Sequence, residues 1–377
     1  MSGPDDAPPG ERATDALDVS DVREHIDSLD RRLLELLDQR ARLALRAGQL
    51  KRESGKDIHD PERETKVFER LEDALKELPD AVFPERSVRP VFREVISACL
   101  ALEQPLSVAY LGPPGTFSHM AAKSAFGVAM RYVDTSTIAG VFDAVMRKEV
   151  TYGVVPIENS TEGGVTFTLD SLIESDVHIR REIVIEVANC LVSRSAELAS
   201  VRKVFSHPQP LGQCRTWLNT NLPHAEIVLS SSTAAAARLA AEEPGSAAIS
   251  SRLAAELHGL TILRADIQDR KHNATRFLVI GERDAPRTGS DRTSIVFSAP
   301  HEQGALRRSL EIFDDAGINL SRIESRPAGK LWEYVFFVDL EGHREDENVK
   351  QALGTLGERA AMLKVLGSYP REAGQAK

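Results

Sequence analysis

The chain has 377 residues, of which 28% are charged and 42% hydrophobic, and its formal net charge is −10. This length exceeds one ordinary core and favours two or three domains, while the acidic balance argues against nucleic acid as a partner. We expect a cytoplasmic protein without membrane contact, because no apolar run reaches the roughly 18 residues of a membrane span and the first residues do not resemble a signal peptide. Three cysteines without metal-ligand spacing predict reduced thiols and no metal site.

The N-terminal unit reads as three helices. Residues 1–18 are rich in Pro, Gly, Asp and Ala without periodicity and are expected to form a disordered tail. From Val22 to Leu50 apolar residues recur at three- and four-residue steps, which predicts one helix about 45 Å long. A compact domain over 19–104 cannot cover such a helix by itself, so we expect a partner helix from a second chain and hence a homodimer. Two shorter helices are predicted, from Asp60-Pro61 to about Leu78 and over 88–102.

The remaining sequence alternates between strand and helix patterns. Short β-like runs separated by helical stretches over 106–283 predict an α/β domain with largely parallel sheets. After a polar spacer, residues 291–371 read strand, helix, strand, strand, helix, strand. That order is the ferredoxin-like βαββαβ plan.

Two cations interrupt the apolar stripe of the first predicted helix. Arg40 falls between Leu36 and Ala44, and Lys51 follows on the same face three turns later. Burying a lone cation is costly unless an anion compensates it. Either residue alone could extend to solvent or form an internal ion pair. Together they could bracket a small dianion.

The segments VREHIDSLDRRLLELLDQRARLALRAGQLK and HDPERE resemble the all-helical chorismate mutase family. The resemblance implies that Arg40 and Lys51 bind chorismate together with Arg23 of the partner subunit. It places Asp60 and Glu64 in the polar lining of the same pocket, although Asp60 is equally suited to cap the following helix.

The third helix departs from the pattern of this family. By register Glu103 stands where many relatives have Gln, and Cys99 stands where some have Ser. A carboxyl group donates a hydrogen bond only when protonated, so Glu103 would need a raised pKa and the mutase should prefer lower pH. The rearrangement moves no proton and requires no cofactor, so binding and charge stabilisation would supply the catalysis.

Polar residues follow several strands of the middle domain, where α/β sheets bind ligands. Each cluster alone could be a turn or a helix cap. The clusters at 158–161, 206–213, 232–233 and 273–277, in this order, resemble prephenate dehydratase. The resemblance implies that two α/β lobes with a cleft, like a type 2 periplasmic binding protein, follow the all-α N-terminal unit. The residues implied in binding prephenate are Thr116, Ser118, Glu158, Asn159, Ser160, Ser206, Gln213, Ser232, Thr233, Thr275, Arg276 and Phe277.

By the same resemblance Thr275 lies near the hydroxyl group that leaves, and Arg276 helps to position the anion. A threonine is a very weak acid, so we expect it to orient a proton, and we take Glu158 as a candidate proton source. His207 has a suitable pKa, but a histidine before proline is more often structural.

The last unit resembles the amino-acid-binding ACT domain, with phenylalanine as effector and feedback inhibition as the implied role. The motif residues are Gly304, Ala305 and Leu306, then Glu324, Ser325, Arg326 and Pro327, with Asn319 and Leu320 approaching from the opposing chain. Binding of a product to one state shifts the equilibrium toward it. The plainer alternative is a structural dimerisation domain.

Three readings of the whole chain remain open at this point. The first is a bifunctional enzyme that converts chorismate to prephenate and prephenate to phenylpyruvate. The second is a monofunctional prephenate or arogenate dehydratase with a helical dimerisation arm, and the third is a non-catalytic solute-binding protein. Rates, channelling, the strength of inhibition and the assembly above a dimer do not follow from the sequence.

Overall fold

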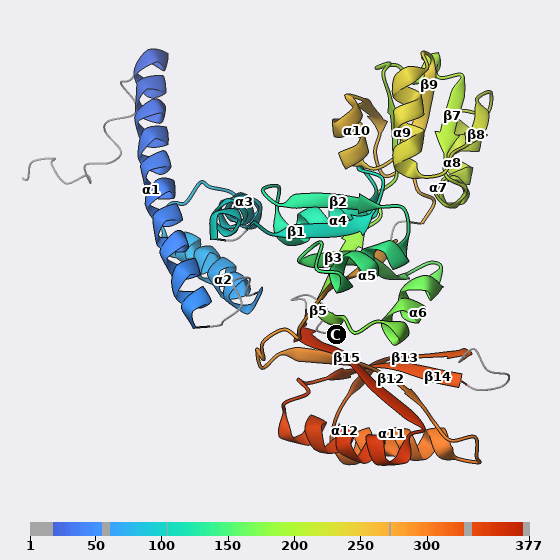
Figure 1. Cartoon of the computed structure of the whole chain (residues 1–377). Helices are drawn as coiled ribbons and strands as arrows, with labels where there is room; N and C mark the ends of the chain where they lie inside the picture. The colour runs from blue at the N-terminus through green and yellow to red at the C-terminus, as the bar shows by residue number, and fades with distance from the viewer. Residues whose placement is uncertain (1–17, 55–60, 104, 271–272, 328–333, 372–377) are drawn as a thin grey trace, which may run out of the picture.

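The computed structural model describes residues 18–54, 61–103, 105–270, 273–327 and 334–371. They form a helical unit, a middle region of two lobes, and a C-terminal unit (Figure 1). Lobe 1 of the middle region contacts the other three parts. Among the described residues, no helix combines the length and the apolar content that a membrane crossing requires.

The helical unit contains α1 (Val19–Glu53), α2 (Pro61–Glu77) and α3 (Glu85–Glu103). The Asp18 side chain starts α1 by accepting hydrogen bonds from two backbone N–H groups of the first turn. The first half of α1 extends away from the rest of the molecule (Figure 1). Its apolar side chains are exposed, namely Val22, Ile26, Leu29, Leu33 and Leu37. A single chain therefore leaves this apolar stripe uncovered.

Each lobe of the middle region has the same strand plan. Lobe 1 has the order β2-β1-β3-β11-β5 with β4 beside β3, and lobe 2 has the order β10-β6-β9-β7-β8. In each lobe three strands are parallel, and the next strand, β11 or β6, is antiparallel to them. The chain thus crosses between the lobes twice, from β5 to β6 and from β10 to β11.

The elements of lobe 1 are β1 (Ser107–Leu111), α4 (Phe117–Phe126), β2 (Arg131–Thr135), α5 (Ile138–Met146), β3 (Tyr152–Asn159), β4 (Gly163–Gly164), α6 (Thr166–Glu174), β5 (His178–Glu186) and β11 (Ala274–Gly281). Those of lobe 2 are β6 (Cys190–Ser193), β7 (Lys203–Ser206), α7 (Pro208–Gln213), α8 (Arg215–Asn221), β8 (Glu226–Leu229), α9 (Thr233–Glu242), β9 (Ser246–Ser250), α10 (Arg252–His258) and β10 (Thr261–Arg264), with a 3₁₀ turn at Leu198–Ser200. The expected two-lobed α/β fold is confirmed.

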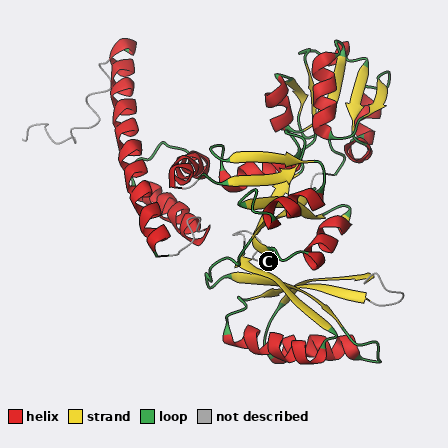
Figure 2. Cartoon of the chain, in the orientation of Figure 1, coloured by secondary structure: helices red, strands yellow, loops and turns green. Residues whose placement is uncertain are grey.

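The C-terminal unit follows the predicted βαββαβ order. It comprises β12 (Asp291–Ser298), α11 (Ala305–Asp315), β13 (Leu320–Pro327), β14 (Tyr334–Glu341), α12 (Glu347–Arg359) and β15 (Met362–Pro370). The antiparallel sheet has the order β13-β14-β12-β15, and both helices cover one face (Figure 2). Its other face packs on lobe 1, because Val335 and Phe337 join the lobe 1 core whereas Val338 and Leu340 join the core under the helices.

Helix α3 joins the helical unit to lobe 1. Ser97 Oγ donates a hydrogen bond of 2.6 Å to the backbone oxygen of Phe126 and accepts one of 3.2 Å from the N–H of Ala129. A side chain at Gly127 would have its Cβ only 2.4 Å from the Cβ of Ser97, and this glycine has a φ of 74°. The two units are therefore in close backbone contact, for which Gly127 is required.

Candidate active sites

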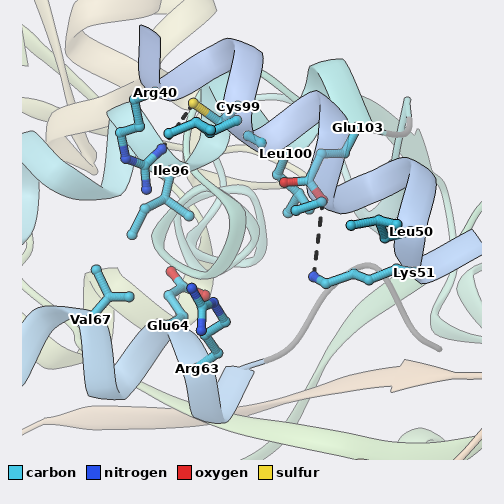
Figure 3. A pocket seen from close by; sticks show the side chains of 13 residues that line it. Arg40, Leu50, Lys51, Arg63, Glu64, Val67, Ile96, Cys99, Leu100 and Glu103 are labelled. Carbon is cyan, nitrogen blue, oxygen red and sulfur yellow. Dashed lines mark hydrogen bonds and ion pairs between the residues drawn. The ribbon is translucent and has the colours of Figure 1, made fainter. Parts of the chain in front are cut away.

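A cavity of about 510 Å³ lies among α1, α2 and α3, and we call it the helical-unit cavity (Figure 3). Arg40 and Lys51 both line it, three turns apart on α1. The structure therefore brings the two unusual cations of the apolar stripe to one cavity. The other lining residues are Leu43, Ala44, Ala47, Leu50, Arg63, Glu64, Val67, Ile96, Cys99, Leu100 and Glu103.

Polar contacts connect α1 to α3 around this cavity. Arg40 Nη1 lies 2.9 Å from Cys99 Sγ, and Lys51 Nζ lies 4.0 Å from Glu103 Oε2. Arg52 Nη1 donates a 2.6 Å hydrogen bond to the backbone oxygen of Glu103 at the end of α3. The side chains of α1 and α3 thus hold each other in place on both sides of the opening (Figure 3).

Glu103 has a raised pKa, as its place in the predicted third helix suggested. Burial raises its pKa above the ordinary value, although Lys51, Arg40 and Arg52 act in the opposite direction. Its Oε2 atom is buried and has no hydrogen-bond partner among the described residues. A protonated Glu103 could therefore donate a hydrogen bond to an acceptor bound in the cavity.

Two further residues expected at this cavity are Asp60 and Arg23. Asp60 lies outside the described residues. Arg23 precedes Arg40 by 17 positions on the same helix, which is about 25 Å along the axis, and it does not line the cavity of its own chain. Arg23 could reach such a cavity only if it came from a second chain.

A second cavity, of about 580 Å³, opens between the two lobes, and we call it the interlobe cleft. It contains eight of the residues expected from the sequence: Thr116, Ser118, Asn159, Gln213, Ser232, Thr233, Thr275 and Phe277. His207, Gln209 and Asn273 also line the cleft. Ser136 and Val187 line it too, although they were not expected from the sequence.

A network of amide side chains connects the lobes at the base of the cleft. Asn159 Nδ2 donates to Thr275 Oγ1 at 2.8 Å and to Asn273 Oδ1 at 3.0 Å. Asn273 Nδ2 in turn donates to Gln213 Oε1 of lobe 2 at 3.2 Å, and Asn189 Nδ2 donates to the same oxygen at 3.1 Å. Because the Thr275 oxygen accepts a hydrogen bond from Asn159, its own proton can be directed into the cleft.

Helix N-termini provide the positive potential of the cleft. Thr116 caps α4 and Ser232 caps α9, each accepting a hydrogen bond from the backbone of the first turn. Both caps line the cleft, and the lining residues that the structure describes include neither Lys nor Arg. Free N–H groups and the helix dipole favour a bound anion at such a place.

Four residues expected at the cleft are not among those that line it. Arg276 and Glu158 pair across β11 and β3 and lie on the side of lobe 1 that faces the C-terminal unit, where Arg322 Nε is 3.3 Å from Glu158 Oε2. Side chains alternate along β11, and the pairing with β3 is irregular beside Glu158. Arg276 Nη2 lies 2.8 Å from Asp339 Oδ2 of the C-terminal unit, and its Nε lies 3.8 Å from Glu158 Oε2. Arg276, expected to position the anion, and Glu158, taken as a candidate proton source, therefore do not line the cleft in this structure.

The two serines are held by backbone groups. Ser206 is fully buried, and its Oγ donates to the backbone oxygen of His207 at 2.9 Å. Ser160 Oγ accepts a 3.0 Å hydrogen bond from the N–H of Ala274. Both stabilise the ends of strands next to the cleft.

A third cavity, of about 380 Å³, lies in the C-terminal unit at the start of α11, and we call it the C-terminal cavity. Ala305 and Leu306 line it, together with Tyr334 and Phe336 of β14. Gly304 precedes α11 with a φ of 77°, a conformation that favours glycine. Asn319 and Leu320 lie beyond the other end of α11 and do not line this cavity, so within one chain the two predicted groups are apart.

The predicted segment Glu324–Pro327 lies on β13 against lobe 1. Arg326 Nη1 donates a 2.8 Å hydrogen bond to the backbone oxygen of Thr166, and it is 3.1 Å from Asp170. The carboxylate of Glu324 occupies the space beside Gly164, which lines the interlobe cleft. This segment thus contacts a wall of the cleft directly. Ser325 is exposed on the same strand.

The sequence reasoning missed three residues that connect the units. Asn189 joins the amide network from the first crossover, Arg181 contacts the helical unit, and Asp339 contacts Arg276. Each is a polar residue within or beside an apolar strand, in EIVIEVANC, HIRREIVIE and YVFFVDLEG. A polar residue in a buried strand needs a partner, and this signal could have identified them.

Comparison with known proteins assigns all three units. The family model for chorismate mutase type II matches residues 22–104, that for prephenate dehydratase matches 108–285, and that for the ACT domain matches 293–358. The bifunctional chorismate mutase/prephenate dehydratase of Aquifex aeolicus is 48% identical over 94% of this chain and 98% of its own. The protein of that name from Neisseria gonorrhoeae is 44% identical over 92% and 96%.

A solved structure shares the second and third units. Prephenate dehydratase from Arthrobacter aurescens, in complex with L-Phe, is 37% identical with a TM-score of 0.65, covering 71% of this chain and 90% of its own. The additional match at 22–104 favours two activities over a dehydratase with a helical arm. The chain belongs to the bifunctional chorismate mutase/prephenate dehydratase family and, with an ACT domain behind its two catalytic domains, acts in phenylalanine biosynthesis.

Proposed function

We propose that the helical-unit cavity is the mutase site and that Arg40 and Lys51 bind the two carboxylates of chorismate there. Guanidinium and ammonium groups on one face of α1 suit a dianion, and the apolar remainder of the lining suits its ring. Glu64 and Cys99 complete the polar lining, and Arg23 of the partner subunit closes the site. Asp60, outside the described residues, is proposed as a further polar group of this site.

The proposed mechanism of the mutase is electrostatic. The rearrangement breaks a C–O bond and forms a C–C bond without proton transfer, so negative charge grows on the ether oxygen as that bond stretches. A protonated Glu103 donates a hydrogen bond to this oxygen. The cations hold the chain of the substrate over its ring, which removes most of the entropic barrier.

For the dehydratase, we propose Thr275 as the residue that polarises the leaving hydroxyl group of prephenate. Asn159 fixes the Thr275 oxygen as an acceptor, so the threonine proton can be directed to the substrate. The N-termini of α4 and α9, with Thr116, Ser118, Ser232 and Thr233, bind the carboxylates. Loss of carbon dioxide and of the hydroxyl group then gives an aromatic ring, which drives the reaction.

We further propose that phenylalanine binds the ACT domain and inhibits the dehydratase. The structure from Arthrobacter aurescens was solved with L-Phe, and here Ala305 and Leu306 line the C-terminal cavity, directly after Gly304. Asn319 and Leu320 complete the site from a second chain. Segment Glu324–Pro327, which touches Gly164 and Thr166 of the dehydratase, supports a direct influence on the cleft.

A homodimer is proposed because the apolar stripe on the first half of α1 is exposed in one chain and Arg23 cannot reach its own cavity. Exposed apolar patches of this extent mark interaction sites. We also propose a cytoplasmic location, because the three cysteines are buried and free, as in a reducing compartment.

The observation that carries the residue assignment is that eight predicted residues from both lobes converge on one cleft. The purified chain should consume chorismate and release phenylpyruvate without added cofactor. Unchanged chorismate would contradict the mutase assignment, whereas accumulation of prephenate would contradict the dehydratase assignment. Parallel assays with arogenate decide which substrate the dehydratase prefers.

A further inference from the structure

Four buried charged side chains meet where lobe 1 packs on the ACT domain. Arg276 and Glu182 come from lobe 1, and Asp339 and Arg292 come from the ACT domain. Arg276 Nη2 lies 2.8 Å from Asp339 Oδ2, and Arg276 Nη1 lies 3.5 Å from Glu182 Oε2. Arg292 also contacts Glu182. Each cation of this group thus has a carboxylate partner, and Arg276 is also 3.8 Å from Glu158, which Arg322 contacts. Pairing of this kind is what allows buried charges to be tolerated.

The surroundings of Asp339 favour its ionised form. Burial alone would raise its pKa, but Arg276, Arg322 and a hydrogen bond from Ser294 together lower the pKa below its ordinary value. Ser294 Oγ lies 2.6 Å from Asp339 Oδ1. The guanidinium of Arg276 is therefore held by an ionised partner that belongs to another domain.

Strand β14 links Asp339 to the proposed effector site. Tyr334 and Phe336 at the start of β14 line the C-terminal cavity. Asp339 follows on the same strand with its side chain on the opposite face of the sheet, toward lobe 1. A shift of β14 on effector binding would therefore move the carboxylate that holds Arg276.

Arg276 is in turn next to Thr275 in the chain. The pairing of β11 with β3 is irregular at this point, because Arg276 pairs with Glu158 but Phe277 pairs with Pro156. A bulge of this kind re-aims side chains and loosens the regular ladder. Thr275 and Arg276 are thus neighbours at an irregular point of the ladder, with Thr275 at the cleft and Arg276 at the ACT domain.

We propose that Asp339 is a positioning residue through which the effector state of the ACT domain reaches the dehydratase site. Asp339 holds Arg276, and Arg276 sets the orientation of the Thr275 hydroxyl. The inference rests on the roles proposed above for Thr275 and for phenylalanine. It assigns the Arg276 side chain to regulation instead of substrate binding.

The test compares the full-length chain with its Asp339→Asn variant. Asparagine keeps the size of the side chain and an acceptor for Ser294, and removes the charge that holds Arg276. The quantity measured is the inhibition ratio, which is dehydratase kcat/KM without phenylalanine divided by kcat/KM with saturating phenylalanine. A variant that changes only the basal rate leaves this ratio unchanged. We expect this ratio to fall by about tenfold, toward one. Calorimetry should still detect phenylalanine binding, and mutase activity of the same preparation reports folding.

Asp284→Asn provides the matched control. Asp284 is a half-buried carboxylate at the same domain boundary, 2.7 Å from Arg344, but it follows the end of β11 that is remote from Thr275. We expect this variant to keep the inhibition ratio of the parent. Arg276→Lys, which keeps the charge but not the planar fork, is the second test variant and should also lower the ratio.

Asp339→Asn with the parent ratio, or an equal loss in Asp284→Asn, would overturn the proposal. Loss of phenylalanine binding in Asp339→Asn would overturn it too, because the residue would then act on the effector site. A parent chain that phenylalanine does not inhibit would instead overturn the proposed regulation. A Thr275→Val chain that still dehydrates prephenate would overturn the role of Thr275.

Discussion

The guanidinium of Arg181 on dehydratase strand β5 lies 3.9 Å from the carboxylate of Glu64 on mutase helix α2. Both side chains are mostly buried, and Glu64 lines the helical-unit cavity. Lobe 1 therefore contacts the wall of the proposed mutase site, in addition to its contact with α3 through Ser97. The mutase and dehydratase domains therefore pack directly against each other, in addition to being joined by the chain.

We expect Arg181→Gln to raise the KM of the mutase for chorismate. The ion pair helps to orient Glu64, and partly exposed pairs contribute up to about 1 kcal/mol, which corresponds to a change of about fivefold. Steady-state mutase kinetics of the full chain measure the effect. Arg238→Gln, which removes an exposed ion pair with Glu242 in lobe 2, is the control and should leave the KM unchanged. An equal KM in both variants would contradict this role for Arg181.

The mutase should lose activity as the pH rises. In the proposed mechanism the active form carries a protonated Glu103, and burial raises the pKa of this group above its ordinary value. The protonated fraction falls as pH increases through that raised pKa, so kcat/KM falls in the same direction. A pH profile of chorismate loss should show this decline for the parent and a flat profile for Glu103→Gln. The same decline in both proteins would show that another group titrates.

Removal of the Thr275 hydroxyl should abolish most dehydratase activity. Thr275→Val keeps the shape of the side chain but loses the hydrogen-bond donor to the leaving hydroxyl group, and a positioned donor of this kind contributes about 10²-fold or more. We expect kcat for prephenate to fall by about that factor, with partial activity in Thr275→Ser. Phenylpyruvate formation measures the reaction. Chorismate loss by the same preparation should be unchanged, and a parallel fall in both activities would instead indicate misfolding.

A charged residue on the exposed stripe of α1 should separate the subunits at the helical unit. Leu29 and Leu33 are 55% and 57% exposed in one chain. In a dimer through this stripe, Leu33→Glu would bury an unpaired charge. We expect mutase activity to become dependent on protein concentration, whereas Arg32→Glu on the same helix, away from this stripe, should not change it. Sedimentation experiments report the accompanying change in mass. Concentration-independent mutase activity in Leu33→Glu would argue against this interface.

The local pattern of residues was sufficient for much of this protein. Periodicity alone predicted α1 and the βαββαβ order, because both depend on spacings of a few residues. It also predicted that Arg40 and Lys51 share a face of α1, and the structure places both at one cavity. The observed helix α1, Val19–Glu53, is a few residues longer at each end than the apolar pattern from Val22 to Leu50. Its first turn is fixed by the Asp18 side chain, which caps the helix.

Only the tertiary structure decided which residues of other elements contact the two faces of each strand. Alternation along β11 already implies that Thr275 and Arg276 face opposite ways, but not which face meets the cleft. The partner of Arg276 is Asp339, 63 positions later, in a domain that packs on lobe 1 through apolar side chains. Glu64 and Arg181 are likewise brought together by the packing of α3 on lobe 1. Such contacts depend on the docking of complete domains, which no local spacing encodes, so the sequence determined the elements and the candidate chemistry while packing decided which residues act together.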